Sequence, residues 1–150
     1  MASPFASSPA PLFDRLCAAA DDSVGPLDAR GLQASLARDL ADLLGTRSRL
    51  PLQRFTDEAG TVLDYGLPDF SALSPRSDDD RQGLKDAIMH AIACFEPRLM
   101  HVQVDVDDWT GNAEHARVHL SAAVRIGNEL RRIDFTLPAG AAAPGLAGSL

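Results

Sequence analysis

The chain has 150 residues, 45% of them hydrophobic, which suits one domain with a single buried core. Its formal net charge of −7 argues against general binding to nucleic acid or anionic membranes, because phosphate binding needs clustered cations. Cys17 and Cys94 lack the spacing of a metal site or a disulfide framework, so we expect reduced thiols in a cytoplasmic protein. The start shows no signal-peptide pattern, and no run reaches the about 18 apolar residues of a membrane span.

The first helix is predicted after a poorly structured start. Residues 1–11 are rich in Ser, Pro and Ala, which predicts a disordered lead-in before a domain at 12–137. Residues 29–44 carry leucines at helical spacing, and Gly45 supplies the stop. This helix is amphipathic and should pack on the rest of the domain through the face formed by Leu32, Leu36, Leu40, Leu43 and Leu44.

The segment at 46–75 contains many prolines and glycines, yet it also carries large apolar residues. In residues 65–70, Gly66 permits a positive φ and Pro68 fixes the next bend, so the aromatic side chains can pin an irregular segment onto the core. From the residues alone, this segment is a packed surface loop.

A second helix is predicted over residues 78–95. Ser77 can cap it, with Asp80 three positions on in an arrangement like a capping box. Its core face repeats at intervals of three and four and consists of Leu84, Ala87, Ile88, Ala91, Ile92 and Phe95.

Beyond Arg98 the period changes to two, which predicts strands. In the first, Met100, Val102, Val104 and Val106 should share one face. A polar loop with Trp109 follows, and then a strand at 116–126. Gly127-Asn128 predicts a two-residue hairpin to a third strand that ends at Leu137, before a flexible Ala/Gly tail at 138–150. If Ile126 pairs with Glu129, the apolar residues of both hairpin strands fall on one face.

Together these elements predict an α+β fold. A small antiparallel three-stranded sheet would be packed against two main helices in a single domain.

The junction Glu96-Pro97-Arg98 carries the sharpest chemistry. Pro97 disfavours the helical region at Glu96, so the helix must end and the strand begin almost at once. By parity, Arg98 belongs to the same face as Met100 and Val102. Its guanidinium either leaves the sheet to meet a partner or returns to pair with Glu96 or another acid, and an incidental surface ion pair is the simplest interpretation.

An enzyme must also be considered. Glu96 could be the acid of a glycoside hydrolase, but the second carboxylate has no obvious identity among the candidates Asp64, Asp69 and Asp105. Cys94 lies among apolar neighbours and is a poor nucleophile candidate. The histidines lack the spacing of metal ligands, so we expect no metal. We also expect no cofactor, and no catalytic residues because neither a carboxylate pair nor a nucleophile is evident.

Two segments in the sequence resemble a known family. They are residues 63–70 (Leu-Asp-Tyr-Gly-Leu-Pro-Asp-Phe) and residues 95–99 (Phe-Glu-Pro-Arg-Leu), supported by residues 11–16 and 40–50. Over residues 11–137 the chain resembles the baseplate-wedge family shared by contractile-tail bacteriophages and the type VI secretion system, and within it the secretion-system branch called TssE.

The resemblance implies a structural subunit and not an enzyme, although the word lysozyme attached to such domains makes a peptidoglycan hydrolase the alternative. It implies docking to the baseplate subunits TssF, TssG and TssK and to the sheath proteins TssB and TssC, where it would help to start sheath assembly. Residues 12–16 would be a docking element, unless they are a frayed turn packed on their own domain. The partner-binding residues implied are Glu96, Pro97, Arg98, Tyr65, Gly66, Leu67, Pro68, Asp69 and Phe70.

Overall fold

A computed structural model describes residues 15–16, 27–58, 60–74, 76–107 and 115–140. The predictions for residues 1–11, for most of 12–16 and for the loop with Trp109 lie outside the described residues. In chain order the elements are α2 (Ala29–Gly45), α3 (Leu52–Glu58), the 3₁₀ turn η1 (Val62–Asp64), α4 (Asp78–Phe95), β1 (Leu99–Asp107), β2 (His115–Ile126) and β3 (Glu129–Gly140).

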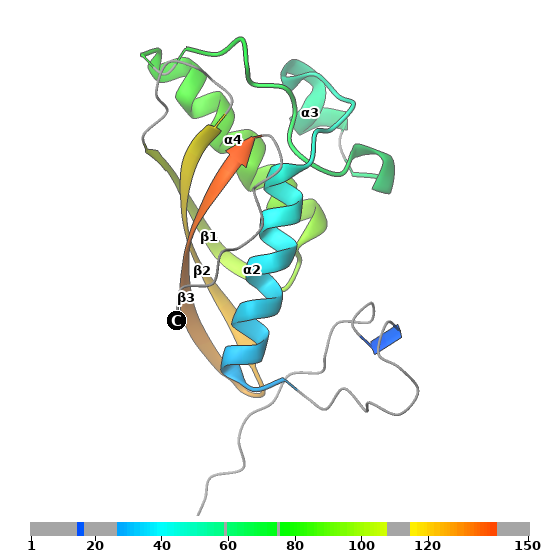
Figure 1. The fold of residues 1–150 in the computed structure, drawn as a ribbon, viewed down its shortest axis with the longest axis vertical. Coiled ribbons are helices and arrows are strands. Elements are labelled where there is room, and N and C mark those ends of the chain that lie inside the picture. Colours follow the sequence, from blue (N-terminus) through cyan, green and yellow to red (C-terminus); the bar gives the residue numbers. More distant parts are fainter. Residues whose placement is uncertain (1–14, 17–26, 59, 75, 108–114, 141–150) are drawn as a thin grey trace, which may run out of the picture.

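The predicted α+β class is confirmed. The sheet has three antiparallel strands in the order β1-β2-β3. α2 packs chiefly against β3 and α4 against β1, and Figure 1 shows α2 running alongside the strands. The core lies between the helices and the face of β2 that carries Val118, Leu120 and Val124, all of them buried.

Both main helices begin at a side-chain cap, of which only the one at Ser77 was predicted. The Asp28 side chain accepts a hydrogen bond from Gly31 N at the start of α2 (2.7 Å). At α4, Ser77 Oγ accepts from Asp80 N (3.2 Å), as predicted. The Asp80 carboxylate instead accepts from Ser74 N (2.8 Å), so it ties the preceding turn to the helix.

The hairpin between β2 and β3 has the predicted register. Ile126 pairs with Glu129, and Leu120 pairs with Phe135, around a turn in which Gly127 adopts φ +60°. β3 nevertheless continues to Gly140. The predicted end of the strand at Leu137 is therefore wrong, and residues 138–140 belong to the strand and not to the tail. β3 is an outer strand, where a proline such as Pro138 is tolerated. The next residue, the buried Ala139, pairs with the buried Ala116.

The predicted alternation in β1 is wrong at its start. Leu99 pairs with Val124 and Met100 with Ala123, but the next pair is Gln103 with Ser121, so an extra residue is inserted. His101 adopts φ +53° at this bulge. The insertion reverses the parity, and Leu99 takes the buried face in place of Met100. The same reversal invalidates the inference that Arg98 shares a face with Val102.

Candidate functional site

The corner between α4 and β1 is held by backbone geometry. α4 ends at Phe95, Glu96 leaves the helical region with φ −131° and ψ +66°, and β1 begins at Leu99. Glu96 N still donates to Ile92 O (2.8 Å), and Leu99 N donates to Glu96 O (3.2 Å). Pro97 has no N–H and keeps Glu96 out of the helical region, so the flanking side chains are fixed in direction.

Arg98 turns back into its own domain. Its Nε donates to Glu96 Oε1 (2.5 Å) and its Nη2 donates to Glu96 Oε2 (2.6 Å). Nη2 also donates to Asp39 Oδ2 on α2. The hydrogen bonds that Arg98 donates to Glu96 and to Asp39 raise the pKa of Arg98 against the opposing effect of burial. The sequence left open whether Arg98 meets a partner protein or pairs with an acid of its own chain. In the structure it pairs within the chain, and its hydrogen bond to Asp39 links the corner to α2.

Glu96 is the more deeply placed partner. Only 5% of this residue is exposed, whereas 31% of the Arg98 side chain is exposed. Both carboxylate oxygens of Glu96 accept hydrogen bonds from the guanidinium. The acid therefore depends on Arg98 for compensation of its buried charge.

A pocket of about 400 Å³ opens beside this pair. The Tyr65 ring meets the Phe95 ring edge to face, with centroids 5.3 Å apart. Burial, and then the charges of Asp42, Asp39 and Glu96, raise the pKa of the Tyr65 hydroxyl. The structure thus brings together the two segments that the sequence singled out. The lining consists of Asp39, Asp42, Leu43, Tyr65, Phe95, Glu96, Pro97 and Arg98.

Most of the residue 65–70 segment is anchored inside the fold. Gly66 has φ +109°, and a Cβ there would lie 2.4 Å from Thr46 O. Leu67 N donates to Thr46 O (2.8 Å), and Ser48 N donates to Leu67 O (2.7 Å). Leu67 and Phe70 are 1% exposed and Pro68 is buried, as expected of a loop pinned onto the core. Only Tyr65, which is half-buried, and Asp69, which is exposed and pairs with Arg47, reach the surface.

None of the three carboxylates proposed to accompany Glu96 lines its pocket. Asp64 is buried and accepts from Thr61 Oγ1 (2.7 Å) and Arg49 Nε (3.0 Å). Asp69 pairs with Arg47, and Asp105 pairs with Lys85 (2.6 Å), which lowers the pKa of Asp105.

The carboxylates that do line the pocket beside Glu96 are Asp39 and Asp42, which were not predicted from the sequence. They lie on α2, three positions apart and beside the buried Leu43. The helical period would have put both on one side of α2, but nothing in the sequence indicated that this side meets the corner at Glu96.

His90 and His119 make local contacts. His90 Nε2 lies 3.5 Å from Cys94 Sγ, and its ring meets Phe55 edge to face. His119 Nδ1 lies 3.0 Å from Thr136 Oγ1, and His101 is exposed at the bulge. Within the described ranges no group of three or more His, Cys, Asp or Glu could hold a metal ion. No helix in that part of the chain is long and apolar enough to cross a membrane.

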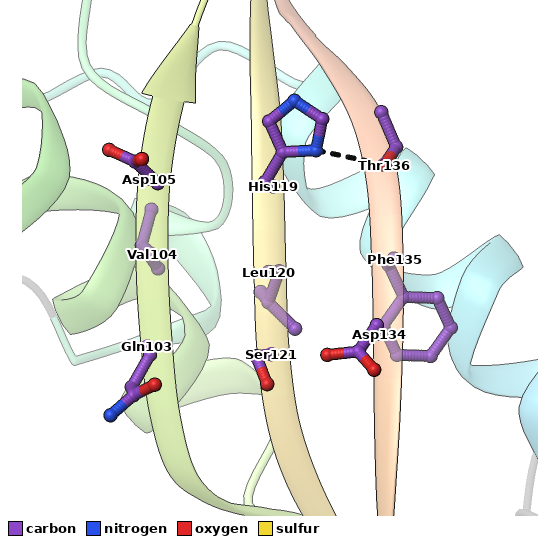
Figure 2. A pocket seen from close by; sticks show the side chains of 9 residues that line it. All are labelled: Gln103, Val104, Asp105, His119, Leu120, Ser121, Asp134, Phe135 and Thr136. Carbon is purple, nitrogen blue, oxygen red and sulfur yellow. Dashed lines mark hydrogen bonds between the residues drawn. The ribbon is translucent and has the colours of Figure 1, made fainter.

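A second hollow, of about 470 Å³, lies on the sheet (Figure 2). Figure 2 shows polar side chains from all three strands around it, namely Gln103, Asp105, His119, Ser121, Asp134 and Thr136. Several of these groups are already paired: His119 with Thr136, Asp105 with Lys85 and Asp134 with Arg132. This arrangement is typical of a solvated sheet face, and of the sequence candidates only Asp105 lies here.

Comparison with known proteins gives one family. Residues 30–129 match the family described as "Baseplate wedge protein gp25". The matched stretch runs from α2 to the start of β3 and includes the corner and its pocket. A chain from a solved structure titled "The baseplate complex from the type VI secretion system" is similar, with 17% identity and a TM-score of 0.48. That alignment covers 73% of this chain and 95% of the other. No curated protein sequence matches.

Proposed function

The chain belongs to the gp25 baseplate wedge family, and from that membership we propose that it is a structural subunit of a type VI secretion baseplate that works in the cytoplasm. The observation that carries the proposal is the family match across both the proline-locked corner and the Tyr65 segment. Its work would be to join proteins and not to transform a substrate.

The proposed docking site is the pocket at the corner. Its groups are held before any partner arrives, because Arg98 is fixed by two acids and Tyr65 by Phe95. Three acids, Asp39, Asp42 and Glu96, face one base, so the pocket carries excess negative charge. A partner surface that offers a basic side chain would complement it. TssF, TssG and TssK are the proposed baseplate partners.

Sheath assembly would start at an open strand edge. The sheet order leaves the outer edges of β1 and β3 available for an added strand, a recognised mode of protein recognition. β1 is interrupted by its bulge, whereas all twelve residues of β3 pair with β2 without a break in register. We therefore favour β3 as the edge on which a strand of TssB or TssC would pair.

Peptidoglycan hydrolysis is the second candidate, because the pocket beside Glu96 does contain other carboxylates. The hydrogen bonding of Glu96 argues against it: a general acid must hold a proton for the leaving group, and both Glu96 oxygens accept from Arg98. We expect the protein to leave a peptidoglycan suspension turbid. Clearing by the wild type that Glu96→Gln abolishes would replace the structural proposal with an enzymatic one.

Asp42→Lys tests the docking site. Asp42 is exposed and has no ion pair among the described residues, so the change should preserve the fold while cancelling the excess negative charge of the pocket. We expect the variant to melt within about 1 °C of the wild type, as surface changes usually do, and to lose co-purification with a TssF–TssG complex. Asp57→Lys on α3 is the matched control, because it makes the same charge change away from the pocket. Equal binding by both variants would refute the site.

A further inference from the structure

Two large aliphatic side chains stand exposed at η1, directly before the anchored segment. Val62 is 86% exposed and Leu63 is 70% exposed. Among the described residues, these are the only large exposed hydrophobics that are adjacent in sequence. Figure 1 shows the turn at the margin of the molecule, on the side of α2 away from the sheet. The residues that follow η1 are largely buried. Val62 and Leu63 are therefore exposed directly before the chain enters the core.

The turn that carries this pair is held by several hydrogen bonds. Asp64 lies under it, 1% exposed, and accepts from Thr61 N (3.1 Å) and Thr61 Oγ1 (2.7 Å) in a reciprocal cap. On the other side, Gly66 packs against Thr46 O. A turn fixed at both ends loses little conformational freedom when a partner covers it, which favours binding.

Arg49 supplies a charge next to the aliphatic pair. Its Nε donates to Asp64 Oδ1 (3.0 Å), which fixes the guanidinium at the residue that follows Leu63, and 63% of the side chain is exposed. Its two terminal nitrogens have no partner in the part of the chain that the structure describes. A carboxylate can accept from both of them in a bidentate pair.

We propose that Val62, Leu63 and Arg49 form a second docking contact, which inserts into an apolar pocket bordered by a carboxylate on another baseplate subunit. The proposal rests on the proposed function for the class of partner. It moves the contact made by this loop from the buried residues Leu67, Pro68 and Phe70 to the exposed turn before them. Arginine together with apolar anchors is the combination typical of interface hot spots.

The test measures the affinity of the full chain for a purified TssF–TssG complex. Replacing both Val62 and Leu63 with Ser should weaken binding roughly 100-fold, because two exposed aliphatic side chains no longer reach their pocket. Leu130→Ser, at a 54% exposed leucine on β3, is the matched control and should change binding less than about threefold. Arg49→Met keeps the aliphatic stem and should weaken binding roughly tenfold while reducing its salt dependence.

The outcomes separate the two proposals. If the wild type binds and the double serine variant binds equally well, this inference is overturned while the proposed function stands. If the wild type does not bind, both are overturned. Light scattering of the isolated chain adds one more outcome: a dimer that the double variant dissolves would assign the turn to a second copy and refute a baseplate partner. Unchanged binding and salt dependence in Arg49→Met would refute the carboxylate.

Discussion

Replacing Arg98 with Ala should destabilise the fold, whatever the variant does to binding. The substitution removes the donors of both Glu96 oxygens and the hydrogen bond that links the corner to Asp39 on α2. Glu96 would remain as a carboxylate that is 5% exposed and has lost its counter-charge.

The magnitude follows from burial. Removing one partner of a fully buried ion pair costs about 3–5 kcal/mol, because the other charge is left uncompensated. The Arg98 side chain is 31% exposed, so water can reach part of the space it leaves. We therefore expect a loss of roughly 2–3 kcal/mol in the free energy of unfolding. This corresponds to a decrease of roughly 8–12 °C in melting temperature for a domain of this size.

Urea and thermal unfolding followed by circular dichroism measure this loss. Glu96→Gln in the Arg98→Ala background is the matched variant, and it should recover part of the loss because a buried amide costs less than a buried charge. A guanidinium directed only at a partner would leave the melting temperature of Arg98→Ala unchanged. A shift below about 1 °C would thus refute a structural role for the pair.

Two further predictions concern the anchored loop. Gly66→Ala should lower the free energy of unfolding by about 3 kcal/mol, because φ is +109° and the new Cβ would lie 2.4 Å from Thr46 O. Chemical denaturation measures this loss, and a loss below about 1 kcal/mol would contradict the close approach. The pKa of Asp64 is lowered from 3.8, mainly by its hydrogen bond from the Thr61 hydroxyl, so its contribution to stability is complete above that pH and is lost as the pH falls through the lower folded pKa. Asp64→Asn should therefore be less stable than the wild type at pH 7, with the difference narrowing below pH 3.8 in acid titrations of unfolding; a constant difference would contradict it.

The elements that the sequence predicted are those whose signals are local. The leucine spacing of α2 and the cap at Ser77 depend only on neighbouring residues, and so does the hairpin at Gly127. The hairpin register followed from the requirement that both strands bury the same face.

The remaining features depend on contacts between distant segments. The bulge at His101 is set by how β1 meets β2 after the corner, and period-two alternation contains no sign of it. Asp39 reaches Arg98 only because α2 crosses the corner. The Tyr65 segment could be predicted to pack through its aromatic residues, but the exposure of Val62 and Leu63 depends on how Asp64 anchors the turn.

Hydrogen exchange of the free chain and of the chain in a TssF–TssG complex tests the docking surface most directly. We predict that binding protects the backbone amides of Tyr65, Glu96 and Arg98, three residues that line the pocket. Amides of β2 beneath the hollow in Figure 2 should exchange as they do in the free chain. Protection confined to that sheet face, with the corner unchanged, would contradict the assignment of the corner as the connector.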